Sequence, residues 1–223
     1  MACSTYTVMM EIAGDTAMWT RPDTGDCPVS LPAPTYSAVK AIFESILLGF
    51  KSLVRPTKVE LCAPLHYHSY HTNYGGPLRQ AKSITEGNSY QLLATVLIDV
   101  CYRLYAEVSI AHGNYSISEK TKQWDKKTTS PAHAYQDIFN RRLKRGQCYA
   151  IPFLGWKEFT PSYFGVFRES TRVQSDITTR IPSMVREVFS GGYNSQPLYT
   201  YDQDVVIANG VLTFATKDGE HDQ

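Results

Sequence analysis

A basic stretch between residues 119 and 145 carries the side chains with the most evident chemistry. It contains eight basic and three acidic residues, a local net charge of +5 in a chain whose total is +1. Trp124, Tyr135 and Tyr149 lie within it or just beyond it. Cations hold phosphates and aromatic rings stack on unpaired bases, so the stretch predicts contact with a nucleic-acid backbone. A lysine-rich loop beside a solvated helix face is the alternative explanation of the same charges.

His133 lies in this stretch, where a helix is expected to begin. An imidazole changes its charge near neutral pH, so it can serve as the general acid or base that RNA cleavage needs. A surface histidine at a helix start is the competing interpretation. His133 is therefore a candidate catalytic residue.

Three further histidines stand close together in the run His66-Tyr-His-Ser-Tyr-His71, near Cys62. In an extended chain His66 and His68 point to the same side, as paired metal ligands must. No acidic residue accompanies them and the spacing matches no zinc module, so a polar, ring-bearing loop that could stack on bases is favoured. The sequence predicts no metal site and no cofactor. A metal-stabilised interaction protein is kept as a second alternative function.

Composition sets the class of protein. The 223 residues are 43% hydrophobic and 19% charged, which is ordinary for a folded chain with one large domain or two small ones. Five scattered cysteines without a C-x-x-C pair favour reduced thiols in a cytoplasm. Residues 1–14 lack the features of a secretion signal, and no run of apolar residues is long enough to span a membrane. The sequence therefore predicts neither secretion nor membrane insertion. Nucleotide-binding, serine-hydrolase and zinc-protease motifs are absent from the sequence.

The first elements that would position these side chains are a strand and a helix. Thr5 to Ala13 is typical of a strand, and Gly14-Asp15 predicts a turn at its end. A proline-rich loop follows. Thr35 suits the N-cap of a helix whose apolar residues, at three- and four-residue spacing, run as far as Gly49.

The later elements are mostly strands. Lys58 to Cys62 indicates a short strand, and the polar residues His66 to Lys82 predict a long excursion. Strict alternation from Val96 to Ile110 predicts a long, half-buried strand. Helical spacing resumes from Ala132 and ends at Gly146, a suitable C′ residue. Asn209-Gly210 between two apolar runs is a strong hairpin signal.

This order of elements favours an α+β fold. The core is expected to be ferredoxin-like (RRM-like), with antiparallel strands and two helices, followed by a smaller β-rich C-terminal region. The predicted domains are residues 1–147, with the excursion near 62–90, and residues 148–223. Such a core hosts many functions, so the fold alone decides none of them.

Several motifs, in order along the chain, resemble one protein family. They are Gly14-Asp-Thr-Ala-Met-Trp-Thr-Arg-Pro22, Pro34-Thr-Tyr-Ser-Ala-Val-Lys-Ala-Ile-Phe-Glu-Ser-Ile46, Asp137-Ile-Phe-Asn-Arg-Arg-Leu-Lys-Arg-Gly-Gln-Cys148, Leu154-Gly-Trp-Lys-Glu-Phe159 and the hairpin Ala208-Asn-Gly-Val-Leu-Thr-Phe214. Together they resemble the CRISPR-associated Cas-five family, Dvulg (type I-C) branch, of the repeat-associated mysterious protein (RAMP) superfamily. Residues 66–82 and 170–201 are poorly covered by the likeness.

The resemblance implies a Cascade subunit in antiviral defence that binds the 5′ handle of the CRISPR guide RNA and caps the complex. Its partners would be the guide RNA, the backbone and large subunits, and target DNA through the assembled complex, with no membrane. The resemblance to this branch also implies a metal-independent endoribonuclease that processes precursor CRISPR RNA. This processing is the alternative function. Such cleavage needs an activated 2′-OH, a proton for the leaving oxygen and a cation for the developing charge.

The family is described with a tyrosine, a lysine and a histidine for this cleavage, and the chain departs from that set. Leu47 stands where the tyrosine is expected, directly after Glu-Ser-Ile. The Lys-His pair aligns either with Ala132-His133 or with Ala134-Tyr135, so at least two of the three positions differ. The subunit either only binds RNA or has a rearranged site. The candidate residues of a rearranged site are His133 and Tyr135, with Lys126 or Lys127 supplying charge.

RNA contacts are predicted around the first helix, in the excursion and at the end of the second helix. The residues are Arg21, Tyr36, Lys40, Arg79, Lys82, Arg141, Arg142, Lys144 and Arg145. Neighbouring positions on a helix point in different directions. Some of the last four cations must therefore face solvent or a partner protein.

Overall fold

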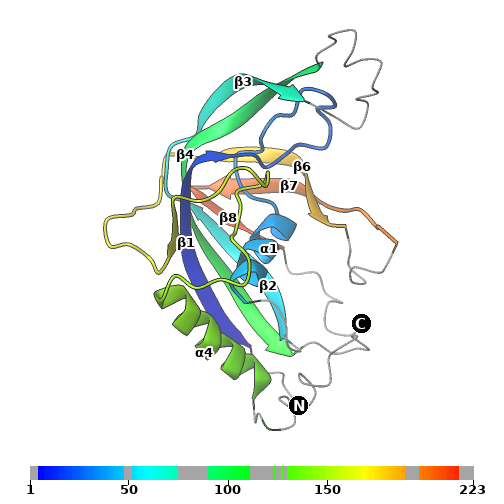
Figure 1. Cartoon of the computed structure of the whole chain (residues 1–223). Helices are drawn as coiled ribbons and strands as arrows, with labels where there is room; N and C mark the ends of the chain where they lie inside the picture. The colour runs from blue at the N-terminus through cyan, green and yellow to red at the C-terminus, as the bar shows by residue number, and fades with distance from the viewer. Residues whose placement is uncertain are drawn as a thin grey trace.

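One antiparallel sheet of eight strands, with two helices, makes up most of the described chain in the computed structural model (Figure 1). The structure describes residues 5–47, 52–74, 90–110, 123, 127, 130–188 and 196–215. The strands are β1 (Tyr6–Ala17), β2 (Ser52–Leu61), β3 (His66–Tyr74), β4 (Tyr90–Ile110), β5 (Tyr163–Gly165), β6 (Thr179–Glu187), β7 (Thr200–Ala208) and β8 (Val211–Thr213). The helices are α1 (Tyr36–Ile46) and α4 (Pro131–Lys144). The strand order is β5-β1-β4-β2-β8-β7-β6, with β3 paired to β4, and this confirms the predicted α+β class.

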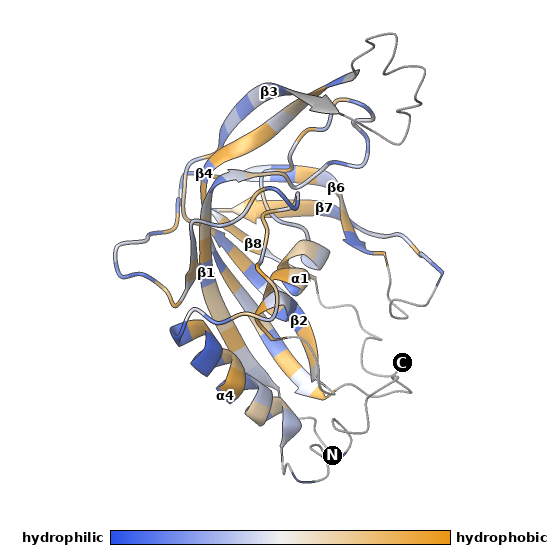
Figure 2. Cartoon of the chain, in the orientation of Figure 1, coloured by the Kyte–Doolittle hydropathy of each residue, from blue (hydrophilic) through white to orange (hydrophobic). Residues whose placement is uncertain are grey.

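Both helices and one side of the sheet share a single large apolar core. In β4 the side chains of Tyr102, Leu104 and Ala106 are buried, while those that alternate with them are exposed or half-buried, as the sequence predicts. Phe43 of α1 and Phe139 of α4 contact each other in this core, with ring centroids 5.5 Å apart. Figure 2 shows that the C-terminal end of α4 is hydrophilic. The core therefore fixes α4 while leaving this end toward solvent.

Strand β1 continues through the turn predicted at Gly14-Asp15. Gly14 pairs with Val100 of β4, and the pairing extends to Ala17. The glycine serves close packing instead of a turn, because a Cβ at this position would lie 2.5 Å from Cδ1 of Leu154. The turn prediction was wrong because the long partner strand outweighs the local turn preference.

The first half of the predicted excursion is also a strand. β3 pairs with the beginning of β4, in a register that runs from His66 opposite Ile98 to Tyr74 opposite Tyr90. The sequence pattern missed it because the side chains of residues 66–71 are polar or aromatic and mostly exposed, without apolar alternation. Figure 1 shows this β3–β4 hairpin reaching beyond the rest of the sheet. Residues 75–89 of the predicted excursion lie outside the described residues.

The helix N-cap at Thr35, the C′ glycine at Gly146 and the Asn209-Gly210 turn are confirmed. Thr35 caps α1, since its Oγ1 accepts a hydrogen bond from the backbone N–H of Ala38 at 3.2 Å. Gly146 follows the end of α4 with a φ of +64°. Asn209 and Gly210 both have positive φ and form the turn between β7 and β8.

The C-terminal third of the chain is rich in strands, and these strands join the same sheet. β5 pairs with β1 and β8 pairs with β2. The division of the chain at residue 147 stays a prediction. Within the described ranges no helix is long and apolar enough to cross a membrane.

Candidate nucleic-acid interface

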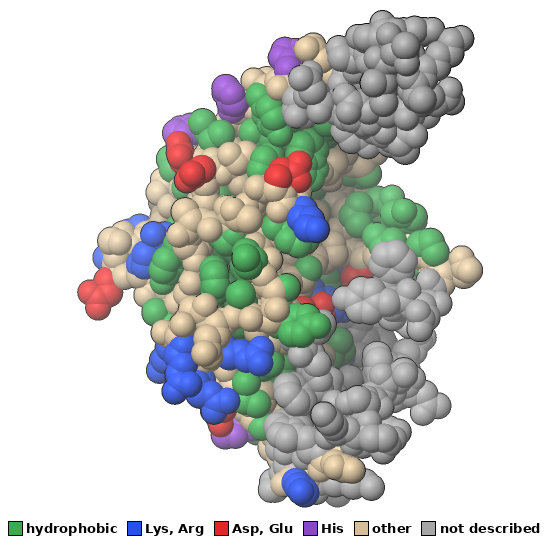
Figure 3. All heavy atoms as spheres, in the orientation of Figure 1, with side chains coloured by type: hydrophobic (Ala, Val, Ile, Leu, Met, Phe, Trp, Pro, Cys, Tyr) green, Lys and Arg blue, Asp and Glu red, His purple; other side chains and the backbone are tan. Residues whose placement is uncertain are grey.

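Three cations are exposed at the C-terminal end of α4. Lys144 and Arg145 follow Arg141 by three and four positions, so both lie on the side of the helix that carries Arg141. We call these three residues the cationic patch. Figure 3 shows Lys and Arg side chains gathered over this end of α4. Such a group of exposed cations suits a phosphodiester backbone.

Arg142, the fourth predicted cation of this helix, points toward the protein. Its Nη1 donates a hydrogen bond to the carbonyl oxygen of Ile46 at 2.9 Å. That carbonyl lies in the last turn of α1, where carbonyls have no partner within the helix and a cation is favourable. Arg142 therefore stabilises the end of α1, and the predicted divergence of the four cations is observed.

Other carbonyl groups at the end of α1 accept hydrogen bonds from α4 and from the segment that follows α4. The backbone N–H groups of Tyr149 and Ala150 donate to the carbonyl of Ser45 at 2.8 and 3.0 Å. The phenol of Tyr135 donates to the carbonyl of Leu47 at 2.8 Å. The Tyr149 side chain remains 66% exposed, four residues after the last cation of the patch. An aromatic ring close to cations is the usual composition of a surface that binds single-stranded RNA.

The two candidate catalytic side chains, His133 and Tyr135, lie on different sides of α4. The His133 ring is exposed, and its Nδ1 lies 3.5 Å from Oδ2 of Asp137. Tyr135 is buried, and burial raises the pKa of its phenol. Positions two apart on a helix do not face each other, so the structure does not bring this pair together. It brings Tyr135 to Leu47, the position at which the resemblance expects a tyrosine.

The predicted contacts on α1 are occupied by other parts of the protein. Tyr36 is buried, and the guanidinium of Arg186 lies 4.2 Å above its ring. Lys40 forms an ion pair with Glu187, with 2.9 Å between Nζ and Oε1. Both partners belong to β6, so these two α1 residues attach the helix to the edge of the sheet.

Arg21 is exposed and lies in the segment between β1 and α1. Its guanidinium forms an ion pair with Asp23 at 2.7 Å, and a hydrogen bond from Arg21 holds the pKa of that carboxyl below its usual range. Arg79, Lys82 and Lys126 lie outside the described residues, whereas Lys127 is described and exposed.

The histidines of the 66–71 run lie on β3 and are exposed. His66 and His68 share one face of the strand, and His71 lies on the other. In the part of the chain that the structure describes, no group of three or more His, Cys, Asp or Glu side chains is placed to hold a metal ion. The run is therefore better described as a row of exposed rings on a hairpin.

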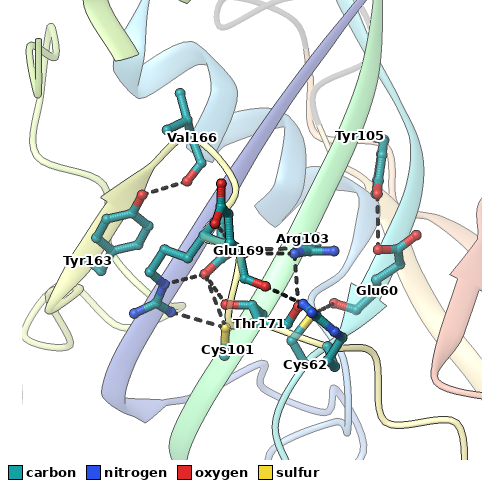
Figure 4. A network of polar contacts seen from close by, with 12 residues as sticks. Glu60, Cys62, Cys101, Arg103, Tyr105, Tyr163, Val166, Glu169 and Thr171 are labelled. Carbon is teal, nitrogen blue, oxygen red and sulfur yellow. Dashed lines mark hydrogen bonds and ion pairs between the residues drawn. The ribbon is translucent and has the colours of Figure 1, made fainter. Parts of the chain in front are cut away.

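A polar network that the sequence pattern did not reveal, with Cys101, Arg103 and Thr171 among its members (Figure 4), lies on the face of the sheet opposite to the apolar core. Glu11 is fully buried and forms ion pairs with Arg103 and Arg168. Thr171 Oγ1 also donates to Glu11 at 2.8 Å, while Arg103 donates to the carbonyls of Arg168 and Thr171 at 3.0 Å each. Burial alone would raise the pKa of Glu11, but hydrogen bonds from Arg168 and Thr171 outweigh burial and lower the pKa. The network fastens residues 168–171 across the sheet.

A lone acid between Met10 and Ile12 in an apolar strand is the one sequence signal for this network. Its partners could not be read from spacing, because Arg168 lies 157 positions away. A second carboxylate, Glu60, accepts from Lys58 at 2.7 Å and from the Tyr105 hydroxyl at 3.0 Å. Burial and this acceptor raise the pKa of Tyr105 to about 12. These residues stabilise the sheet and leave the cationic patch as the better candidate for RNA.

Comparison with solved structures gives the same fold. A structure described as "Crystal Structure of CRISPR-associated Protein" matches with a TM-score of 0.68 at 18% identity, over 97% of this chain and 95% of that one. A chain of a "CRISPR RNA-guided surveillance complex" matches with a TM-score of 0.54 at 14% identity, over 93% and 91% of the two chains. At these identities the likeness shows a shared fold.

Comparison with known sequences gives the family. A Thermus thermophilus protein named "CRISPR pre-crRNA endoribonuclease Cas5d" is 29% identical over 158 residues, which are 70% of this chain and 62% of that protein. The match thus spans less than two thirds of the relative's length. The model of the family described as "CRISPR-associated protein (Cas_Cas5)" matches residues 7–211, nearly the whole chain. The chain therefore belongs to the Cas5 family of CRISPR-associated proteins.

Proposed function

We propose that the chain is the subunit of a CRISPR surveillance complex that binds the 5′ handle of the guide RNA and caps the complex. Family membership and the exposed cationic patch support this proposal together. The backbone and large subunits would be its protein neighbours, and target DNA would be met through the assembled complex in the cytoplasm. A chain that shares the fold belongs to a "CRISPR RNA-guided surveillance complex", which favours the same role.

The patch is the observation that carries the proposal. Arg141, Lys144 and Arg145 point to one side without an ion pair to a described carboxylate, whereas Arg142 is held by Ile46. A strand of RNA crossing the end of α4 could place a phosphate near each exposed cation. The Tyr149 ring would then be available to stack on a base.

Copurification tests the proposal. The chain, coexpressed with its neighbouring genes, should carry short CRISPR RNA and partner subunits. A triple variant with Arg141, Lys144 and Arg145 changed to Ala should retain the partners but carry much less RNA. Arg180→Ala is the matched control, because Arg180 is an exposed arginine on β6, paired with Asp204. Preparations of the unaltered chain that hold neither RNA nor partners would reject the proposal.

Processing of precursor RNA is the second candidate function, favoured by the name of the Thermus relative. The chemistry would be attack of a 2′-OH on the neighbouring phosphorus, with a proton given to the departing 5′ oxygen. His133 is exposed and can carry that proton. His133 and Lys144 lie roughly 16 Å apart along α4, because the helix rises 1.5 Å per residue. The scissile phosphate would therefore lie some nucleotides away from the cationic patch.

Repeat RNA incubated with the pure chain in EDTA tests this second function. Cutting that is lost in His133→Ala and kept in Asn140→Ala, an exposed residue on the same helix, would support it. Tyr135→Phe removes only the buried hydroxyl and tests whether the phenol takes part. RNA that stays intact with the unaltered chain would leave binding as the function.

A further inference from the structure

The β3–β4 hairpin leaves the sheet at a junction in the middle of β4. The last pair between β2 and β4 is Leu61 with Tyr102, and the first pair between β3 and β4 is His66 with Ile98. Between these pairs β4 contains Asp99, whose φ of +54° is unusual for a residue with a side chain. On this side of β4 the chain passes from one strand partner to another, while β1 pairs with the other side of β4 as far as Leu97.

Two cysteines face each other at this junction. Cys62 directly follows β2, and its backbone N–H donates to the carbonyl of Cys101 on β4 at 2.8 Å. Leu61 pairs with Tyr102, so the next residues along, Cys62 and Cys101, lie opposite each other and on the same face of the sheet. Cross-strand neighbours have Cβ atoms about 4.5 to 5.5 Å apart, which is within a small adjustment of the roughly 3.5 to 4.5 Å that a disulfide requires. Both are free thiols in the structure.

The two sulfurs have different surroundings. The neighbouring Cys62 thiol lowers the pKa of Cys101, and Arg168 Nη2, 3.5 Å from the Cys101 sulfur, lowers it further. Glu11 lies 3.8 Å from the same sulfur and opposes this effect. The neighbouring Cys101 thiol and burial raise the pKa of Cys62. Figure 4 shows both cysteines within the polar network. The thiol with the lowered pKa is also the more exposed of the two.

We infer that Cys62 and Cys101 form an oxidation site that closes a disulfide across the base of the β3–β4 hairpin. The Cys101 thiolate attacks a hydroperoxide, the O–O bond breaks, and Cys101 becomes a sulfenic acid. The Cys62 sulfur then attacks that sulfur and releases water, so two thiols lose two electrons and two protons. The peroxide, the oxidant, is reduced to water and the corresponding alcohol, or to water alone. The bond ties the end of β2 to β4 at the point where the partner of β4 on that side changes from β2 to β3.

This site is independent of the proposed RNA binding, so the experiment uses the full chain without RNA. Hydrogen peroxide is added in steps, free thiols are blocked, and the protein is digested without reduction. We expect a linked Cys62–Cys101 peptide to form before the exposed Cys27 is oxidised. Oxidation of Cys27 or Cys148 while both junction thiols stay reduced would overturn the inference.

Variants test the order of the steps. Cys62→Ser should leave a Cys101 sulfenic acid that dimedone traps, whereas Cys101→Ser should leave Cys62 unmodified. Trapping at Cys62 instead would contradict the assigned roles. The oxidised unaltered chain should also exchange the Cys62 backbone amide at least several-fold more slowly than the reduced chain, because the bond opposes separation of the strands. Equal exchange in the two forms would contradict the closure of the junction.

Discussion

The phenol of Tyr135 donates a hydrogen bond to the backbone carbonyl of Leu47 at 2.8 Å and thereby joins α4 to the end of α1. Leu47 stands where the family resemblance expects a tyrosine, and the phenol that reaches this position comes from α4. Because that phenol is buried, we expect its removal to reduce the stability of the fold.

Tyr135→Phe should lower the free energy of unfolding by about 1 to 2 kcal/mol, because the Leu47 carbonyl would lose its side-chain donor in a buried place. Urea unfolding monitored by fluorescence measures this loss. Tyr149→Phe, on an exposed ring, should change stability by less than about 0.5 kcal/mol. Equal stability of the two variants would contradict the assigned bond.

Arg142 and Arg141 are adjacent on α4 and should behave differently. Arg142→Ala removes the donor to the Ile46 carbonyl and should cost about 1 to 2 kcal/mol of stability, with little effect on RNA affinity. Arg141→Ala should leave stability nearly unchanged and weaken RNA binding in a salt-dependent way. Thermal unfolding and filter binding on both variants check the pair. The reverse assignment of effects would show that Arg142 faces the RNA.

Glu11→Gln should lower the stability at pH 7 by about 2 to 3 kcal/mol, since Arg103 and the partly exposed Arg168 lose their counter-charge. The folded protein holds the pKa of Glu11 below its ordinary 4.5, so this carboxylate stabilises the fold above that pH. The contribution is lost as the pH falls through the lowered folded pKa. Urea unfolding between pH 7 and pH 3 should therefore show a smaller acid-induced loss in the variant. Parallel pH curves would contradict this account.

Gly155→Ala should prevent folding or cost more than about 3 kcal/mol, because φ is +93° and a Cβ would clash with the carbonyl oxygen of Met18. Gly25→Ala is the matched control, with a φ of +53° and open space around the position. It should cost only about 1 kcal/mol. Soluble yield and the unfolding midpoint compare the two, and similar values would contradict the close approach at Gly155.

Local features of the fold could be predicted from the sequence, and features that depend on distant partners could not. The alternation in β4, the Thr35 cap and the Asn209-Gly210 turn each depend on neighbours in the chain. Strand β3 was missed because its pairing with β4, and not an apolar face, defines it.

The candidate site shows the same division. Helical spacing was enough to predict that the four cations of α4 diverge, but not that Arg142 reaches Ile46, 96 positions earlier. The burial of Tyr36 against Arg186 depends on packing between α1 and β6, which no local pattern contains. The partners of Glu11 are equally remote along the chain.

The salt dependence of RNA binding tests the central claim most directly. Affinity for a single-stranded repeat RNA is measured from low to moderate salt for the unaltered chain and for the triple variant with Ala at 141, 144 and 145. Each lost phosphate contact should reduce the slope of log K against log salt by about 0.7, so the variant's slope should be shallower by about 2. An unchanged affinity and slope would contradict the account and place the RNA on another surface.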